Sequence, residues 1–197
     1  MGTMKISAHI ITRFSIQLGT IMDIRKACEA DIDQIESIYD RILDEEEAGK
    51  VTIGWVRGIY PARNTAEEAL KRKDLFVMED DGIIVATAII NHIQVPEYRF
   101  AEWKHNASDE NIMVLHTLIV NPQQKAKGYG KAFVSYYENY ARGNNCHELR
   151  MDTNIVNTRA RKMYANLGYD EVGIVDCIFN GIPEVKLVCL EKYLLPG

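Results

Sequence analysis

Hydrophobic positions follow two different periods along the chain, and the two periods separate predicted helices from predicted strands. Apolar residues at helical spacing follow Asp31, which is placed to cap a helix that Gly49 ends. A second predicted helix begins with a Thr65-x-x-Glu68 capping box and ends near Lys73. The first third of the chain is therefore predicted to carry two surface helices.

Two more amphipathic helices are predicted in the second half. One ends at Gly143 and presents an aromatic face made by Phe133, Tyr136, Tyr137 and Tyr140. The other covers residues 157–168, with Gly168 as the residue just past its end and with Ala160, Met163, Tyr164 and Leu167 on one face. Each helix is amphipathic, so each is expected to cover one face of a sheet.

Strand patterns fill the spaces between these helices. Residues 75–91 contain two β-rich runs around Asp80-Asp81-Gly82, which is a strong hairpin signal, and a second pair of strands is predicted around Asn180-Gly181. Residues 112–120 are almost continuously apolar, as in a strand buried on both faces. With short strands at 22–27 and 147–153, the order β-α-α-β-β-β-α-β-α-β-β predicts one mixed α/β domain over residues 22–197. Residues 1–21 are predicted to be an N-terminal extension or leader.

Composition narrows the class of protein. The chain has 197 residues, 47% of them hydrophobic, which suffices for one domain with a sizeable core. Its net charge of -5 disfavours nucleic acid as a partner and leans weakly toward cationic substrates. No apolar run approaches the length of a membrane span, so no membrane partner is expected.

Four cysteines, at positions 28, 146, 177 and 189, include no C-x-x-C pair. This spacing fits neither a zinc site nor a disulfide framework. We therefore expect reduced, structural thiols in a cytoplasmic protein, and no metal.

The stretch VNPQQKAKGYGKAF, residues 120–133, has the chemistry of a phosphate-binding loop. Gly128 and Gly130 stand where a buried strand turns into a helix, whose first amides lack partners and whose dipole is positive at that end. Charge is added around the same spot by Lys125, Lys127 and Lys131. A pyrophosphate is the simplest ligand, although a turn before a surface helix explains this stretch alone equally well.

Two familiar phosphate loops are excluded by counting. A Walker loop ending at Lys131 needs glycine at position 125, which is lysine, and Ser or Thr at position 132, which is alanine. A dinucleotide fingerprint starting at Gly128 needs a third glycine at position 133, where Phe133 stands. The loop belongs to neither class.

A second motif, NTRARKMYANLGY at residues 157–169, favours phosphate binding over a plain turn. It matches N-x-x-A-x-x-[FLM]-Y-x-x-L-G-[FY], and residues 120–130 match V-x-P-x-x-[RQ]-x-x-G-x-G except that Lys125 replaces Arg or Gln. The two motifs together resemble the GCN5-related N-acetyltransferase (GNAT) family, and the order of elements from about Met22 to Lys192 agrees with it. Because loops of this family hold phosphate largely through backbone amides, Lys125 is expected to preserve binding, although it cannot form the fork of hydrogen bonds that a guanidinium makes.

The resemblance implies a single-domain α/β GNAT fold. It has a mixed, mostly antiparallel central sheet with splayed central parallel strands, flanked by helices. It implies acetyl-CoA as co-substrate, with its pantetheine arm between the splayed strands near Leu118, Ile119 and Val120. Further cofactor contacts are implied at Asn157 and Tyr164, and the pyrophosphate is expected on the loop residues Lys125, Ala126, Lys127, Gly128, Tyr129, Gly130 and Lys131.

The resemblance also suggests catalytic roles, each with a structural alternative. Tyr164 is the candidate general acid toward the departing thiolate, and otherwise a core tyrosine on an apolar helix face. Asn157 either bonds the cofactor or caps its helix. His116 is a candidate general base on the strand beside the thioester, although a lone histidine on an apolar strand is more often a structural one. Acidic alternatives for the base are Glu79, Glu102 and Asp152.

Four aromatic residues occupy the two loops expected to flank an acceptor cleft: Trp55, Tyr60, Tyr98 and Trp103. They are candidates for holding a cationic amine, or for burying a loop or a dimer contact.

The expected acceptor is a small primary amine, and the expected assembly is a monomer or homodimer. A protein N-terminus or lysine as acceptor, an acyl-CoA sensor without catalysis, and a structural protein with a vestigial site remain alternatives.

Overall fold

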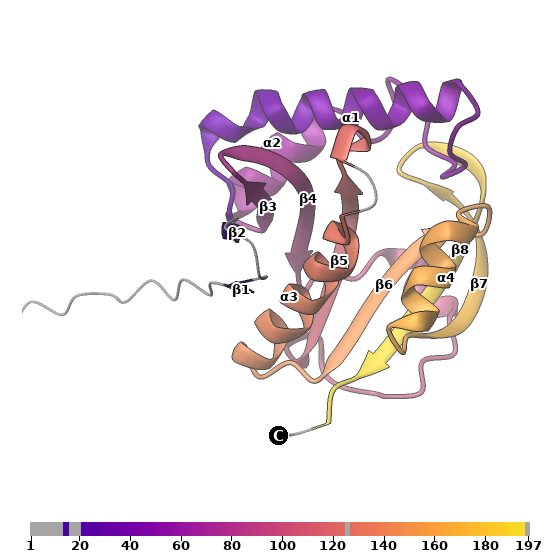
Figure 1. The fold of residues 1–197 in the computed structure, drawn as a ribbon. Helices are drawn as coiled ribbons and strands as arrows, with labels where there is room; N and C mark the ends of the chain where they lie inside the picture. Colours follow the sequence, from indigo (N-terminus) through magenta and orange to yellow (C-terminus); the bar gives the residue numbers. More distant parts are fainter. Residues whose placement is uncertain (1–13, 16–20, 125–126, 196–197) are drawn as a thin grey trace, which may run out of the picture.

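The computed structural model describes residues 14–15, 21–124 and 127–195. The described strands form one eight-stranded sheet in the order β1-β2-β3-β4-β5-β6-β8-β7 (Figure 1). Neighbouring strands are antiparallel except β5 and β6, which are parallel. The predicted mixed, mostly antiparallel sheet is confirmed. Its strands are β1 (Phe14–Ser15), β2 (Ile21–Lys26), β3 (Leu75–Asp80), β4 (Ile83–Asn91), β5 (Ile112–Val120), β6 (Glu148–Asn154), β7 (Asp170–Phe179) and β8 (Ile182–Tyr193).

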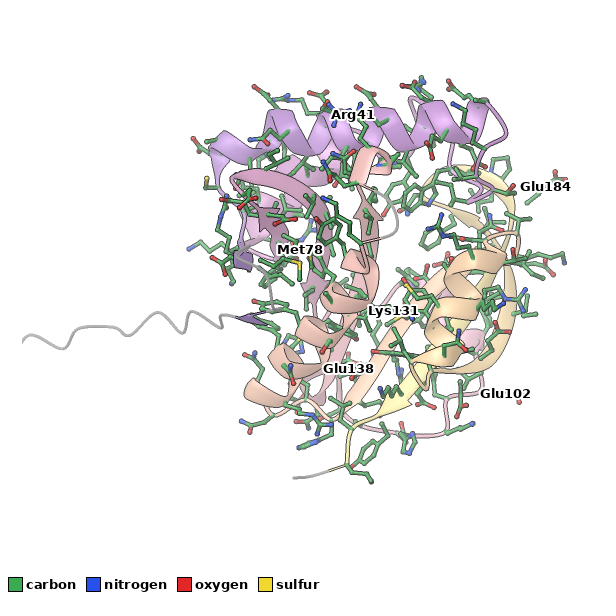
Figure 2. All side chains as sticks on the ribbon, viewed as in Figure 1. Arg41, Met78, Glu102, Lys131, Glu138 and Glu184 are labelled. Carbon is green, nitrogen blue, oxygen red and sulfur yellow. The ribbon has the colours of Figure 1, made fainter. Side chains whose placement is uncertain are left out.

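Within the part of the chain that the structure describes, four α-helices cover the two faces of this sheet: α1 (Ile32–Glu47), α2 (Arg63–Arg72), α3 (Tyr129–Gly143) and α4 (Thr158–Asn166). Side chains alternate along each strand, so β3 sends Phe76 and Met78 to the α3 and α4 side and Leu75 and Val77 to the α1 and α2 side. Figure 2 shows Met78 inside the molecule and Arg41 on the outer surface of α1. The apolar residues at strand and helix spacing thus pack into two core layers on opposite faces of the sheet.

The starts of the first two helices differ in detail from the predicted caps. Asp31 precedes α1 as expected, but its carboxylate accepts from the Cys28 backbone N–H at 2.8 Å and pairs with Arg25 at 2.7 Å. The prediction that Thr65 caps α2 was wrong, because the helix begins at Arg63. Thr65 lies in the first turn and its Oγ1 accepts the Ala62 backbone N–H at 3.1 Å. The hydroxyl satisfies an amide from inside the helix, which its sequence position alone did not reveal.

The parallel strands β5 and β6 separate halfway along their length. They pair from Ile112 opposite Glu148 to Leu115 opposite Met151, and the described residues show no pairing beyond that point. On its other edge β5 stays paired with β4, where a register shift lies between Thr87 and Ile89. Thr117, on β5 at this irregularity, has a φ of 51°, so β5 bends where it leaves β6. The predicted splay of the central parallel strands is confirmed.

The segment between β4 and β5, residues 92–111, is fastened to the sheet by a buried ionic cluster. Arg150 is paired with Glu148, and its Nη2 donates to the backbone carbonyl of His105 at 3.1 Å. The Glu191 carboxylate accepts the backbone N–H groups of Lys104 and His105 at 3.0 and 3.1 Å. Buried charges with this many hydrogen bonds are fully compensated, so the segment is held in one position.

Two features outside the core bear on the predicted organisation. Phe14 and Ser15, inside the predicted extension, pair with β2 and add a short edge strand. The other residues of that extension, except Ile21, lie outside the described residues, as do Lys125 and Ala126. Within the described ranges, no helix is both long enough and apolar enough to cross a bilayer.

Candidate active site

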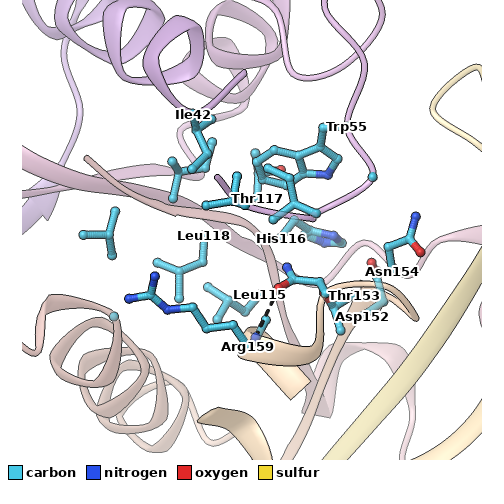
Figure 3. A pocket seen from close by; sticks show the side chains of 18 of the residues that line it. Ile42, Trp55, Leu115, His116, Thr117, Leu118, Asp152, Thr153, Asn154 and Arg159 are labelled. Atoms are coloured by element: carbon cyan, nitrogen blue, oxygen red, sulfur yellow. Dashed lines mark hydrogen bonds between the residues drawn. The ribbon is translucent and has the colours of Figure 1, made fainter. Parts of the chain in front are cut away.

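A cavity of 1250 Å³ opens where β5 and β6 separate (Figure 3). Its walls come from the ends of β5 and β6, the first turns of α3 and α4, the loop of residues 51–61 and the β7–β8 turn. These segments are far apart in the sequence. The cavity has a helix end, formed by α3 and α4, and a loop end, formed by residues 51–61 and the β7–β8 turn.

The first turn of α3 supplies hydrogen-bond donors to the helix end. Gly128 precedes the helix with a φ of 80°, a left-handed conformation that favours glycine. The backbone N–H groups of Tyr129, Gly130 and Lys131 have no acceptor within the helix, because the helical ladder starts with Ala132 donating to Gly128 at 3.0 Å. With Lys127 also lining the cavity, this turn suits an anion. Figure 2 shows Lys131 at the start of α3.

Gly130 and Tyr129 hold this turn in place. A Cβ at Gly130 would lie 3.3 Å from the Met163 sulfur and 3.7 Å from Val120, so the glycine lets α3 approach α4 and β5 closely. The Tyr129 hydroxyl donates a short hydrogen bond to the Asp80 carboxylate at the end of β3. The sequence placed both residues in a cofactor loop, and the structure adds a packing role for each.

The first turn of α4 faces the same cavity. Asn157 caps the helix, with its Oδ1 accepting the Ala160 backbone N–H at 3.1 Å, and no acceptor for its side-chain amide nitrogen is found among the described residues. Arg159 and Lys162, both exposed, line the cavity beside it. Sequence reasoning missed these two cations, although both lie inside the second motif. The helix end therefore combines two helix N-termini with four basic side chains: Lys127, Lys131, Arg159 and Lys162.

The splayed edge of β5 forms the floor of the cavity between its two ends. Leu118, Ile119 and Val120 all line it, but they face different ways. Leu118 and Val120 pack against the α3 and α4 layer, whereas Ile119 is only 2% exposed and packs in the α1 and α2 layer. Ile119 can therefore contribute only its backbone to the cavity.

Tyr164 reaches the cavity from α4. It is 7% exposed, and its ring makes an edge contact with Tyr169 at 6.0 Å. Burial, followed by the charge of nearby Asp152, raises the pKa of its phenol. No hydrogen bond to its hydroxyl is found among the described residues. A phenol that stays protonated at neutral pH can donate a proton into the cavity.

His116 lines the cavity but is poorly suited to accept a proton. Its Nε2 lies 3.1 Å from Asn91 Oδ1, which can only accept, so this nitrogen carries the hydrogen. Burial lowers the pKa of His116 to about 4. The imidazole is neutral at pH 7, and a conjugate acid this strong makes it a weak base.

Asp152, at the end of β6, is the better-placed acceptor. Burial raises the pKa of its carboxyl to about 7, and the Tyr98 hydroxyl, which donates to its Oδ2 at 2.8 Å, offsets part of that rise. Asp152 lines the cavity, whereas the other acidic candidates, Glu79 and Glu102, do not. Glu79 is instead paired with Arg25 at 3.1 Å.

The loop of residues 51–61 closes the loop end and is pinned on several sides. The Glu46 carboxylate of α1 accepts the backbone N–H groups of Ile53 and Gly54 at 2.7 and 2.9 Å. Gly54 lies so close to β6 that a Cβ there would be 2.2 Å from the Asn154 amide nitrogen. The Tyr60 hydroxyl makes a short hydrogen bond with Thr117 on β5. The loop therefore joins α1, β5 and β6 across the cavity.

Three aromatic rings line the loop end. Trp55 and Tyr60 meet edge to face at 5.8 Å between ring centroids, and Tyr60 meets Phe179 of β7 at 6.4 Å. Phe179 was missed by the sequence because it precedes a turn 119 positions from Tyr60. Tyr98 is buried against Trp103 at 5.0 Å, and neither lines the cavity. Of the four aromatic residues proposed for the acceptor cleft, the structure brings two to it.

Comparison with known proteins identifies the family. The model of the acetyltransferase (GNAT) family matches residues 34–169, which is more than half of the chain. The protein belongs to the GNAT family. A curated relative, aminoglycoside N(6')-acetyltransferase type 1 of Klebsiella aerogenes, is 33% identical over 67 residues. That match covers 34% of this chain and 44% of the relative, so it spans less than half of the relative's length.

Solved structures share the GNAT fold over nearly the whole chain. A GNAT-family acetyltransferase from Streptococcus agalactiae 2603 has a TM-score of 0.74 and 22% identity, covering 89% of this chain and 96% of its own. A ribosomal-protein-alanine N-acetyltransferase from Brucella melitensis has a TM-score of 0.64 and 18% identity, covering 87% and 99%. The protein yncA from Salmonella typhimurium, solved with its cofactor acetyl-CoA, has a TM-score of 0.62 and 16% identity, covering 89% and 95%. At these identities the likeness establishes the fold.

Proposed function

We propose that this GNAT protein transfers the acetyl group of acetyl-CoA to a primary amine of a small molecule, by direct attack in a ternary complex. The observation that carries the proposal is the cavity at the β5–β6 splay, which has anion-binding groups at its helix end and Asp152 and Tyr164 beside its floor. Family membership supports the same reaction class.

The residues at the helix end fit the cofactor chemically. Three amides at the start of α3 that have no acceptor within the helix, the positive ends of α3 and α4, and four basic side chains match a diphosphate. The unpaired edge of β5 at Leu118–Val120 offers backbone groups to an amide-bearing arm. When bound, acetyl-CoA supplies an activated acetyl thioester. Lys125 and Ala126 remain part of the proposed cofactor site and lie outside the described residues.

The proton transfers can be assigned to residues of this chain. Asp152, with its pKa near 7, takes the proton that the ammonium must lose before its nitrogen can bond to the acetyl carbon. As the carbon–sulfur bond breaks, Tyr164 gives its phenolic proton to the departing sulfur. The nitrogen now bonded to the acetyl carbon gives its surplus proton to the Tyr164 phenolate, which restores the phenol. The proton held by Asp152 returns to solvent, so the net products are the amide, the free thiol and one proton. We assign no proton transfer to His116, whose Nε2 is hydrogen-bonded to Asn91.

Several observations favour a small acceptor over a protein N-terminus or a lysine side chain. The loop of residues 51–61 is bonded to α1 and to β5 and touches β6, so it encloses the loop end. Ile59 of the same loop is close to the β7–β8 turn, since a Cβ at Gly181 would be 3.3 Å from it. A peptide needs an open groove to lie in. The partial match to an aminoglycoside acetyltransferase also supports a small-molecule acceptor.

The remaining features of the proposal concern organisation and location. We assign residues 22–197 to the enzyme domain and residues 1–21 to an extension. All four cysteines are free thiols, which agrees with a reducing, cytoplasmic location.

The proposal is tested by incubating the purified protein with acetyl-CoA and a panel of primary amines while measuring the release of free thiol. We expect amine-dependent release and an N-acetylated product by mass spectrometry. Calorimetric titration with coenzyme A separates the alternatives. Binding without turnover would leave an acyl-CoA sensor, and no binding would leave a structural protein.

Replacing Tyr164 by Phe tests its role as the acid. We expect kcat to fall about 10²-fold, with coenzyme A affinity nearly unchanged, because the ring still packs against Tyr169 while the proton donor is lost. If coenzyme A affinity and the stability of the fold fell together with kcat, Tyr164 would be a core residue with no role as the acid.

A further inference from the structure

The side chains at the loop end of the cavity indicate which class of small amine the acceptor belongs to. We propose that the acceptor is a monoamine with an apolar body, bound with its nitrogen at Asp152 and its body against the rings of Trp55, Tyr60 and Phe179. This inference rests on the proposed acetyltransferase function and names the substrate class for the same cavity.

The first argument is where the apolar surface lies. The three rings form a continuous edge-to-face series, with centroids 5.8 and 6.4 Å apart. The strand β8 adds aliphatic side chains to the same wall through Ile182, Val185 and Leu187. Apolar area removed from water contributes about 25 cal/mol per Å², so a hydrocarbon or aromatic body binds here and a heavily hydroxylated one gains little.

The second argument is where this surface meets the reacting groups. Tyr60 is hydrogen-bonded to Thr117 on the floor of the cavity, and Tyr60 and Asp152 both line the cavity. An acceptor whose nitrogen meets Asp152 can therefore place its body against Tyr60 within the same cavity. Trp55 and Phe179 each contact Tyr60 edge to face, so the three rings offer one apolar surface to the body of the acceptor (Figure 3 labels Trp55, Thr117 and Asp152).

The third argument is the number of carboxylates. Among the described residues that line the cavity, three carry a carboxylate: Glu45, Glu68 and Asp152. Glu68 is paired with Lys71 at 2.7 Å, and Glu45 is already engaged by another group of the protein, whereas Asp152 accepts the Tyr98 hydroxyl and has no cationic partner among the described residues. Each ammonium group taken out of water needs a partner. One carboxylate beside three aromatic rings matches one ammonium, and a polycation such as an aminoglycoside or a polyamine would leave charges uncompensated.

The experiment compares four acceptors at saturating acetyl-CoA: 2-phenylethylamine, ethylamine, spermidine and the aminoglycoside kanamycin. We expect kcat/KM for 2-phenylethylamine to exceed that for each of the other three by at least about tenfold, since only it combines one ammonium with an apolar body. A tenfold preference for spermidine or kanamycin would overturn the substrate class and leave the acetyltransferase function standing.

A matched pair of variants on β7 locates the effect. Phe179→Ala removes a ring from the cavity, and Ile178→Ala truncates the adjacent side chain, which is 69% exposed and does not line it. We expect KM for 2-phenylethylamine to rise about tenfold in Phe179→Ala, with KM for ethylamine changed less than twofold and Ile178→Ala like the parent. Equal KM values for 2-phenylethylamine in the two variants would overturn the proposal.

Direct binding keeps this inference separate from the function on which it rests. If the protein binds coenzyme A but releases no thiol with any amine, 2-phenylethylamine is titrated calorimetrically into the coenzyme A complex. Binding that Phe179→Ala weakens and Ile178→Ala does not would support the acceptor pocket even though the catalytic function had failed. Absence of binding would overturn the pocket as well.

Discussion

The two ends of the cavity are built in different ways. At the helix end, the binding groups come from two short continuous segments, residues 127–131 and 157–162, and many of them are backbone amides. At the loop end, the groups are side chains from α1, the 51–61 loop, β5, β6 and the β7–β8 hairpin. The helix end suits the cofactor proposed for it, and the loop end can vary with the acceptor without changing the helix end.

The same contrast appears in what holds each end together. The helix end depends on close backbone packing, such as Gly130 against Met163 and Val120. The loop end depends on side-chain bonds between distant segments, such as Glu46 to Ile53 and Tyr60 to Thr117. Variants that change one end and spare the other therefore test whether the two ends serve two substrates.

The largest effect is expected for Asp152→Asn, which removes the proposed base at the boundary between the two ends. We expect kcat/KM to fall about 10²–10⁴-fold, because a neutral amide cannot take a proton from the ammonium, while Tyr98 keeps an acceptor for its hydroxyl. Thiol release measures the rate, and calorimetry should show coenzyme A affinity unchanged. Activity above a tenth of the parent would assign deprotonation to another group.

Stability checks that this variant is folded and that Asp152 is perturbed. The pKa of Asp152 is about 7 in the folded protein against an ordinary 3.8, so the folded state holds an extra proton between these values and loses stability as the pH rises through them. Asp152→Asn removes that loss. We expect it to unfold at a higher temperature than the parent at pH 8, with a smaller difference at pH 5.

The next largest effect is expected for Gly128→Ala at the helix end. An alanine in the left-handed conformation is strained by ~1–2 kcal/mol, and relief of that strain would move the amides aimed at the cavity. We expect coenzyme A affinity to fall about tenfold, by calorimetry. Gly82→Ala is the matched control, because Gly82 has a φ of 76° in the β3–β4 turn, away from the cavity. If both variants bound coenzyme A equally, α3 would not be the anion site.

A smaller effect is expected for Tyr98→Phe, which changes Asp152 without touching the cofactor. The Tyr98 hydroxyl lowers the pKa of Asp152, so its loss raises that pKa further and moves the acidic limb of the pH–rate profile to higher pH. We expect a several-fold loss of kcat/KM at pH 6.5 and recovery at pH 9, measured by thiol release. A uniform loss at all pH values would indicate only a disturbed fold.

The smallest effect is expected for His116→Gln. Burial holds the pKa of His116 near 4, and its Nε2 donates to Asn91. Glutamine can therefore replace the hydrogen bond, and both side chains are uncharged at pH 7. We expect kcat/KM within about tenfold of the parent and an unshifted pH profile. A loss of 10²-fold with a lost acidic limb would make His116 the base in place of Asp152.

The sequence determined the fold and the helix end of the cavity, because both depend on local patterns in the chain. Strand and helix periods, the Asp81-Gly82 turn and the two motifs are local patterns, and each imposes its structure within about a dozen residues. The order of elements predicted a mixed α/β domain, the glycine loop predicted Gly128 at the start of α3, and the resemblance to the GNAT family implied the splay of β5 and β6.

Only the tertiary structure decided the loop end and the choice among proton acceptors. Phe179 meets Tyr60, and Tyr98 meets Asp152, across separations that leave no periodic signal in the chain. His116 and Asp152 looked alike as titratable residues on strands, and burial moved their pKa values in opposite directions because it disfavours the charged form of each. The sequence shows which side chains can carry a charge, but the fold decides how far each one is exposed to water and which groups surround it.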